Sequence, residues 1–495
     1  MNTKKLILIL ISCVLIFSNN GSFAVEEVDE HELFHNVVEV KDGSQLTLKD
    51  CISSAFRNSP KIRKRKYELD LAKANVGIAK SQFFPVISAG VGFYNQNNSN
   101  NIYYNSHYRE LPSVGASINQ LVWNFGKSTA YIKMEKFYQI GAEYEFMDSI
   151  CSTLFDVKAK YYNVLRTKAM TEIAGYNQFL NENFVKLAKS KKQYDLLTAE
   201  IYLNDTMVKG IEAQNNYKNA LIDLSNAMFI ENHPDYTITP TKTFNFNDDI
   251  IYNPQKFKND KFIPEKLGFE IDKAVDIAYE NSPDLKVLIA VKDAMQESLK
   301  YIKRTYFPDL TADVGYGFNN TNIEGKNNSL RVGVNLISSV NLMELKHGIK
   351  GAQAEVNIAG DEIEHFKKDL YFEVKRALNN VEKSENQIIT SKLAIENAFN
   401  NLQLIEKAYK ADEVDHVALQ DARKDYINAL SNYVNAMYDY NLALIQVEMA
   451  MHYHITDIHH KSDHAVHYHS DDLIEHLEEA LDCNEEDIRK NEKRK

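Results

Sequence analysis

Two stretches of this sequence, Asn58-Ser59-Pro60 and Asn281-Ser282-Pro283, carry the same three residues. In each case a Phe-Pro pair follows 25 residues later, as Phe84-Pro85 and as Phe307-Pro308. An alternating, glycine-containing stretch comes next in both halves, and a very long segment without proline follows it. Duplication of a whole unit is typical of a repeat architecture. The sequence therefore predicts a fold built from two structural repeats.

Apolar residues alternate with small or polar residues after each Phe-Pro pair, which is the period of a β-strand. The pattern predicts two hairpins, with strands at about residues 86–94, 113–122, 309–318 and 329–338. A tilted transmembrane strand has this length and alternation, although a soluble β-sandwich would show the alternation too. Four strands cannot close a barrel, because the smallest bacterial barrels have ~8. A membrane barrel would therefore have to be shared by several copies of the chain.

Long helices are predicted at about residues 127–228 and 343–451, because no proline lies between Pro112 and Pro234 or after Pro308. A helix of ~68 residues would reach ~100 Å, which no compact domain needs. Small residues recur at every seventh position of the second segment, which is the spacing of a helix-packing seam. The seam is formed by Ala422, Ala429, Ala436, Ala443 and Ala450. Such helices could pack side by side into a wall, or form an ordinary bundle within one chain.

The N-terminus has the layout of a secretory signal peptide over residues 1–24. Lys4 and Lys5 precede an apolar run of about 12 residues, which is short for a membrane span of ~20. Cys13 also offers a possible lipoprotein site, and residues 25–45 form an N-terminal extension. The formal net charge of −12 is opposite in sign to that of a general nucleic-acid binder.

The repeated motifs, taken in order, resemble the TolC-type family of outer-membrane efflux channels over about residues 46–451. The stretch from Gln120 to Gly126 is similar to the family's passage from a strand into a long helix. Ala408-Tyr409 and Asp421-Ala422 are similar to the Tyr and Asp-Ala of the family's inner hairpin. The glycine usual between these two motifs is absent, since Asp412 stands at roughly that place.

The resemblance implies a mainly α protein with membrane β-strands, in two repeats at residues 46–228 and 269–451. It also implies a homotrimer that shares a 12-stranded barrel in the outer-membrane lipid and a 12-helix α-barrel across the periplasm. The implied partners are a periplasmic adaptor and an inner-membrane pump of the RND or ABC type. Residues 229–268, rich in proline, are expected to link the repeats at the waist of the α-barrel.

Acidic side chains near the predicted helical tips are the candidates for a pore constriction, because acids repeated by symmetry can ring a pore and favour cations. Asp421 matches the family position, and Asp205 stands in the corresponding place of the first repeat. Tyr409 could brace a closed tip by hydrogen bonding. The further acidic candidates are Asp412, Glu413 and Asp415 near the second tip, and Asp195 and Glu200 near the first. A solvated, charged helix face is the alternative for each of them.

The C-terminal tail, residues 452–495, is acidic and rich in histidine. Imidazole clusters bind zinc, copper or nickel, so the tail is a possible metal buffer. A flexible acidic extension is the alternative, because the histidine spacing matches no fixed site. The candidate ligands are His452, His454, His459, His460, His464, His467 and His469.

The leading interpretation is an outer-membrane exit duct of a tripartite efflux pump or a type I secretion system, passing small molecules or polypeptides. The sequence contains no phosphate-binding glycine loop, no H-E-x-x-H and no convincing catalytic triad, so we expect neither an enzyme nor a bound cofactor. The alternatives are a structural or adhesive surface coiled coil and a soluble periplasmic helical binding protein.

Overall fold

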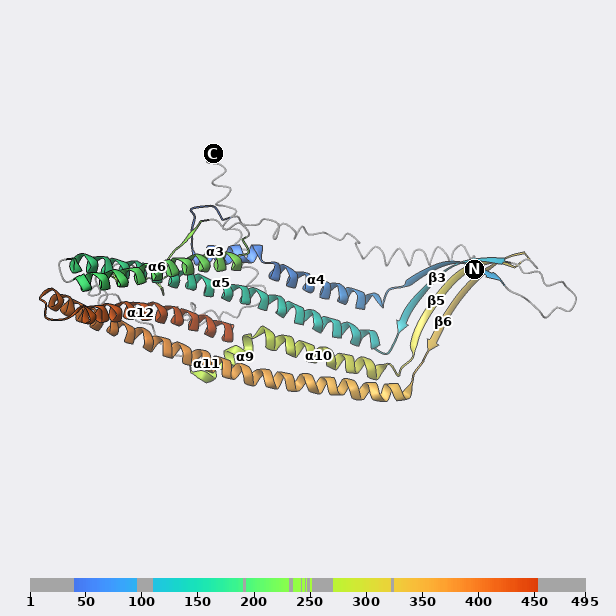
Figure 1. The fold of residues 1–495 in the computed structure, drawn as a ribbon. Coiled ribbons are helices and arrows are strands. Elements are labelled where there is room, and N and C mark those ends of the chain that lie inside the picture. The colour runs from blue at the N-terminus through green and yellow to red at the C-terminus, as the bar shows by residue number, and fades with distance from the viewer. Residues whose placement is uncertain are drawn as a thin grey trace, which may run out of the picture.

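A computed structural model describes residues 40–95, 110–189, 193–230, 270–321 and 325–452, together with most of 235–251. Within 235–251, positions 242, 245 and 247–249 are not described. The predicted signal peptide, Cys13 and all of the tail beyond residue 452 lie outside the described residues. The described chain is elongated, with a β-sheet at one end and long helices running away from it (Figure 1).

The chain is mainly helical and contains the two repeats that the sequence predicted. The first repeat consists of α3 (Leu48–Asn58), α4 (Pro60–Ser81), β2 (Val86–Asn95), β3 (Glu110–Trp123), α5 (Lys127–Ala188) and α6 (Gln193–Ala227). The second consists of α9 (Ile271–Asn281), α10 (Pro283–Arg304), β5 (Asp309–Thr321), β6 (Gly325–Ile337), α11 (Leu342–Lys410) and α12 (His416–Met451). Each repeat thus runs short helix, helix, hairpin and long helical pair.

The repeated Asn-Ser-Pro motif ends one helix and starts the next. The hydroxyl of Ser59 accepts a hydrogen bond from the Ile62 amide, and Ser282 does the same for Leu285. Proline then occupies the first position of α4 and of α10, where its missing N–H and fixed φ are tolerated. The motif is therefore a helix break with a built-in N-cap, which explains why it occurs once in each repeat.

The two repeats pass from strand to long helix in different ways. In the first, Gly126 has a φ of +83°, and its carbonyl oxygen accepts a hydrogen bond from Arg304 Nη1 at 2.8 Å. In the second, Asn341 caps α11, because its side-chain oxygen accepts from the amides of Met343 and Glu344. In the second repeat the side-chain cap of Asn341 therefore takes the place of the left-handed Gly126, and α11 starts without a glycine.

The four long strands form one antiparallel sheet in the order β2-β3-β5-β6. The registers place Gly90 opposite Gly115, and Gly115 opposite Gly317. The sheet ends at β2 on one side and at β6 on the other, and neither has a further strand partner within the described chain. The two edge strands run in opposite directions, because each neighbouring pair in the sheet is antiparallel.

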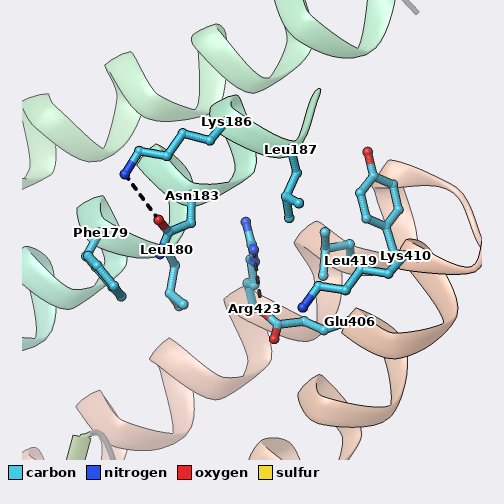
Figure 2. Close-up of a pocket in the computed structure, with 10 residues that line it drawn as sticks. Phe179, Leu180, Asn183, Lys186, Leu187, Glu406, Lys410, Leu419 and Arg423 are labelled. Atoms are coloured by element: carbon cyan, nitrogen blue, oxygen red, sulfur yellow. Dashed lines mark hydrogen bonds and ion pairs between the residues drawn. The ribbon is translucent and has the colours of Figure 1, made fainter. Parts of the chain in front are cut away.

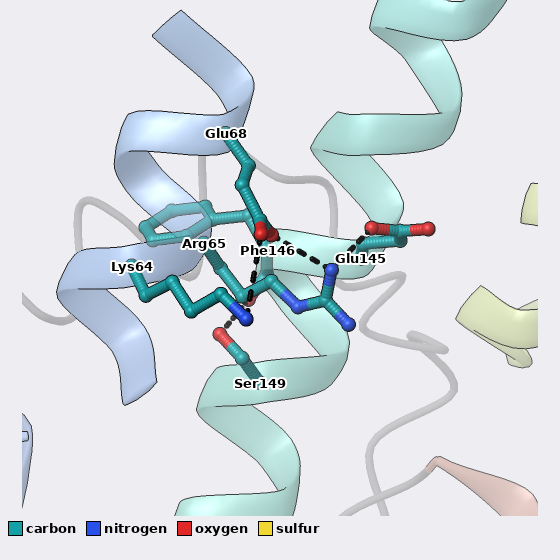
Figure 3. A network of polar contacts seen from close by, with 6 residues as sticks. All are labelled: Lys64, Arg65, Glu68, Glu145, Phe146 and Ser149. Carbon is teal, nitrogen blue, oxygen red and sulfur yellow. Dashed lines mark hydrogen bonds and ion pairs between the residues drawn. The ribbon is translucent and has the colours of Figure 1, made fainter. Parts of the chain in front are cut away.

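The two longest helices, α5 and α11, each pack against shorter helices along both of their halves. α5 has 62 residues and α11 has 69, which corresponds to about 90 and 100 Å of helix. α4 packs against the half of α5 nearer the sheet, where Arg65 Nη1 lies 2.6 Å from Glu145 and 2.8 Å from Glu68 (Figure 3). The bond from Arg65 lowers the pKa of the Glu68 carboxyl. α6 packs along the other half of α5, and α12 along the corresponding part of α11.

The predicted alanine seam is buried inside the chain. Ala422, Ala429, Ala436, Ala443 and Ala450 are all at most 6 % exposed. Tyr426 and Tyr433 on the same helix are also buried, and the ring of Tyr426 meets that of Tyr176 on α5 edge to face. The seam therefore lies against other helices of the same chain, and the contact between Tyr426 and Tyr176 joins the two repeats beside it.

The segment between the repeats crosses the helices near their middle. β4 (Thr237–Ile238) pairs in parallel with β1 (Gln45–Leu46), and Tyr161 on α5 donates to the Thr239 carbonyl at 2.6 Å. Further along, the Ile251 carbonyl accepts from the hydroxyl of Tyr426 on α12 at 2.9 Å. The segment thus contacts helices of both repeats.

Candidate functional site

One face of the sheet is apolar along all four strands. Val91 is 70 % exposed and Val334 is 71 % exposed, although buried valine is the norm in a soluble protein. The ladder registers line up the apolar side chains across the sheet. They are Ile87, Ala89, Val91, Val114, Ala116, Ile118, Val314, Tyr316, Leu330, Val332 and Val334. This apolar face has the character of a lipid-facing surface.

The opposite face of the sheet carries mostly small and polar residues. Glycines and serines from all four strands lie there, according to the same registers. They are Ser88, Gly90, Gly115, Ser117, Gly315, Gly317, Ser329 and Gly333. Two charged residues, Asp313 and Arg331, lie on the same face; Arg331 Nε lies 3.3 Å from Asp313 Oδ2, and the Asn335 amide donates to Asp313. A face of small and polar residues has the character of a surface that lines an aqueous lumen.

The far end of the α11–α12 hairpin is a tight turn closed by backbone hydrogen bonds. Asp412 has a φ of +60°, its amide donates to the Tyr409 carbonyl, and the Glu413 amide donates to the Ala408 carbonyl. This is the Schellman arrangement, in which glycine usually occupies the left-handed position. Asp415 then caps α12, since its Oδ1 accepts from the Ala418 amide at 2.9 Å.

Of the predicted constriction residues, Tyr409 is buried, whereas the acidic ones lie on the surface of the single chain. Tyr409 packs its ring edge to face against Phe184 at 5.9 Å, which joins α11 to α5. Asp421 is exposed on α12, and Asp205 on α6 is exposed and paired with Lys209 at 2.6 Å. Asp195 lies 3.5 Å from His416 Nδ1, an ion pair only when the imidazole is protonated. Glu200 and Glu413 are exposed.

The only described residue of the predicted histidine cluster is His452, at the C-terminal end of α12. It is a helix C-cap with a φ of +45°. Burial and the nearby Lys286 lower the pKa of its imidazole to about 4, so it is neutral at pH 7. No group of three or more His, Cys, Asp or Glu side chains within the described residues could hold a metal ion. His454, His459, His460, His464, His467 and His469 lie outside the described residues.

Three buried charged residues are not predicted by the sequence pattern. Lys158 Nζ and Glu448 Oε2 lie 2.6 Å apart between α5 and α12. Arg423 is only 3 % exposed on α12, beside Ala422. A signal existed for Arg423, because it falls on the same helical stripe as Leu419, Tyr426 and Leu430, where an arginine is out of place. Nothing in the pattern pairs Lys158 with Glu448, which are 290 residues apart.

Comparison with known protein families identifies the family of this chain. The family model described as "Outer membrane efflux protein" matches residues 51–228 and 274–451, which is more than half of the chain. The chain belongs to the outer membrane efflux protein family. The two matched stretches coincide with the two repeats of the fold, so family and architecture agree. The resemblance to TolC-type channels is confirmed.

Solved structures of several outer-membrane channels have the same fold. The CmeC outer membrane channel of Campylobacter jejuni is 14 % identical at a TM-score of 0.68, with 85 % of this chain and 91 % of that chain covered. The open state of the MtrE outer membrane channel of Neisseria gonorrhoeae is 13 % identical at a TM-score of 0.66, with 85 % and 94 % covered. VceC of Vibrio cholerae is 12 % identical at 0.65, with 82 % and 95 % covered.

No curated protein matches this sequence. Within the described part of the chain, no helix is both long and apolar enough to cross a membrane. Membership of the efflux protein family establishes an outer-membrane efflux channel whose helical part lies in the periplasm. The family is one of channels rather than of enzymes.

Proposed function

We propose that this family member is the exit duct of a tripartite efflux pump or of a type I secretion system. The observation that carries the proposal is the four-stranded sheet with one apolar face, one glycine- and serine-rich face and two open edges. Such a sheet fits a barrel wall between lipid and water. The long helices would extend the same passage through the periplasm.

The strand directions support closure by several copies of the chain. Because β2 and β6 run in opposite directions, β6 of one copy can pair antiparallel with β2 of the next. Two copies would give eight strands, a barrel whose interior is just wide enough for side chains to fill. Three copies give twelve strands and leave a lumen, in line with the trimer that the family resemblance implies. In this proposed trimer each chain contributes a first repeat at residues 46–228, a linker at 229–268 and a second repeat at 269–451.

The proposed partners follow from the position of each end. The periplasmic tips, at the α5–α6 and α11–α12 turns, would dock a periplasmic adaptor, which connects to an inner-membrane pump. Asp421 and Asp205 are exposed near these tips and would be repeated three times in a trimer. Six carboxylates around one passage would favour cations, with Tyr409, Asp412 and Asp415 supporting the turn that carries them.

A matched pair of variants tests the barrel. Ile118 lies on the apolar face of β3 and Ser117 on the opposite face, at the same depth. Ile118→Arg should prevent stable insertion, since a lipid-facing arginine costs about 2–4 kcal/mol per chain near the midplane. Ser117→Arg should still insert, because its side chain enters the lumen. Native mass spectrometry of the outer-membrane fraction measures the trimer in each case. Equal effects of the two substitutions would contradict the two-faced barrel.

Deletion of the chain in its own bacterium distinguishes the two export systems. If the duct serves an efflux pump, the deletion strain should accumulate a fluorescent dye such as ethidium and recover on complementation. If it serves type I secretion, dye levels should stay normal and one or more polypeptides should vanish from the medium. A strain in which both exports remain intact would refute the exit-duct function.

A further inference from the structure

The structure has a cationic pocket between the two helical hairpins, close to the tip. Its volume is about 410 Å³, and α5 supplies one wall while α11 and α12 supply the other (Figure 2). Among the lining side chains are three cations, Lys186, Lys410 and Arg423, and one anion, Glu406. This local excess of positive charge contrasts with the net charge of the whole chain, which is −12.

Arg423 lies at the centre of this pocket with hydrogen-bonding capacity unused. Its side chain is 3 % exposed, and Nη2 lies 3.4 Å from Glu406 Oε1. Among the described residues, Nε and Nη1 have no hydrogen-bond partner. The ring centre of Phe184 lies 5.4 Å from the guanidinium carbon, and Nε and Nη1 are both buried. A buried cation with unsatisfied donors is costly, since nearly all buried polar groups in proteins are hydrogen-bonded.

Two lysines also line the pocket, Lys410 on the side of Arg423 and Lys186 on the opposite wall, where its ammonium points toward Asn183. Figure 2 shows Arg423 reaching from α12 toward α5, with Lys410 and Glu406 pointing toward it from the same side. Lys186 stands on the α5 wall and contacts the Asn183 side-chain oxygen at 3.4 Å. Glu406 offsets one of the three positive charges, so the pocket keeps a net positive charge.

We propose that this pocket binds a small dissolved oxyanion, a carboxylate or phosphate compound, between Arg423, Lys410 and Lys186. The guanidinium presents several N–H donors in a plane, a geometry that matches carboxylate and phosphate oxygens. A bound oxyanion would supply the counter-charge that the three cations lack, and it would bridge α5 of the first repeat to α11 and α12 of the second. It would therefore hold the two hairpins together near the tip. The site is additional to the duct function and does not depend on it.

Equilibrium dialysis of the detergent-purified full chain with radiolabelled citrate and inorganic phosphate tests the proposal. Ionic strength is held constant with sodium chloride, so that screening does not vary. We expect saturable binding of one anion per chain, and the tighter of the two probes identifies the oxyanion as carboxylate or phosphate. Arg423→Met should weaken this binding at least tenfold. The exposed Arg376 on α11 offers a matched control, and Arg376→Gln should leave binding unchanged.

Two further variants keep the test decisive if Arg423→Met fails to fold. Lys186 and Lys410 are exposed, so their replacement by Gln should preserve the fold. Each change should weaken binding several-fold, because each removes one charge from the pocket. Absence of saturable binding of both probes up to tens of millimolar would overturn the site. Binding that is unaffected by both lysine substitutions would overturn it as well.

Discussion

Replacing Lys158 by Met should destabilise the contact between the two repeats severely. Lys158 and Glu448 are each 9 % exposed in their side chains, and their charged atoms lie 2.6 Å apart. Removing one partner of a buried ion pair costs about 3–5 kcal/mol, because the other charge stays buried after its ion-pair partner is gone. Replacing both by apolar residues of similar size is often close to neutral. The double variant Lys158→Met/Glu448→Met should therefore recover most of the lost stability.

The rate of unfolding in guanidinium, followed by the helical circular dichroism signal, is the suitable assay for a large membrane protein. If the pair is broken in the transition state, 3–5 kcal/mol corresponds to about 10²–10⁴-fold faster unfolding. The double variant should unfold within about tenfold of the parent. Lys160→Met is the control two residues away, since Lys160 is 39 % exposed and lies 4.0 Å from Asp223. Such surface pairs contribute at most about 1 kcal/mol. Equal unfolding rates for the single and double variants would refute the buried-pair reasoning.

Four further outcomes are expected. Gly126→Ala should destabilise the chain by about 1–2 kcal/mol or more, because φ is +83° and the new Cβ would lie 2.9 Å from Arg304 Nη1; an unchanged melting temperature would contradict this. Ser282→Ala should cost about 1 kcal/mol through loss of the cap, whereas Ser282→Asp should retain it in the same melt. The pKa of His452 is about 4 in the folded chain and 6.5 in the unfolded chain. The stability that depends on its neutral imidazole is therefore fully present above pH 6.5, and the free energy of unfolding falls by about 3 kcal/mol as the pH is lowered toward 4. His452→Asn should flatten this pH dependence of unfolding, and equal slopes would disprove it. Asp421→Asn should lower the cation preference of the single-channel conductance, with Asp425→Asn on the same helix as control; identical shifts would exclude a specific role for Asp421.

Local signals made the fold predictable. Ser59 and Ser282 each precede a proline, and a capping side chain followed by proline favours the start of a helix, so the breaks could be placed from sequence. Glycine-rich alternation fixed which side chains share a sheet face, because a strand has a period of two. The seventh-residue alanines likewise identified a seam. Each of these features depends on residues close together in the chain.

The site was harder to predict because its geometry depends on distant residues and on turns. Asp415 was a candidate for a pore ring, but in the structure its Oδ1 accepts from the Ala418 amide as an N-cap. Asp205 pairs with Lys209 one turn away, a contact that sequence spacing permits and does not require. The surroundings of Arg423 include the Phe184 ring and the pocket-lining Lys186, both on α5 and more than 230 residues earlier in the chain, so the sequence near Arg423 does not predict them.

The two ends of the helical part are held by different forces, and this constrains how a duct could open. At the sheet end, bonds cross between repeats: Arg304 donates to Gly126, and Lys127 lies 2.6 Å from Asp309. At the tip, aromatic packing by Phe184 and an under-satisfied Arg423 join the hairpins. The hydrogen bond and the ion pair at the sheet end fix the angle between the strands and the long helices. The pocket between the hairpins at the tip, in contrast, can be filled or emptied. Movement of the hairpins should therefore concentrate at the tip, while the sheet and its junctions keep their geometry.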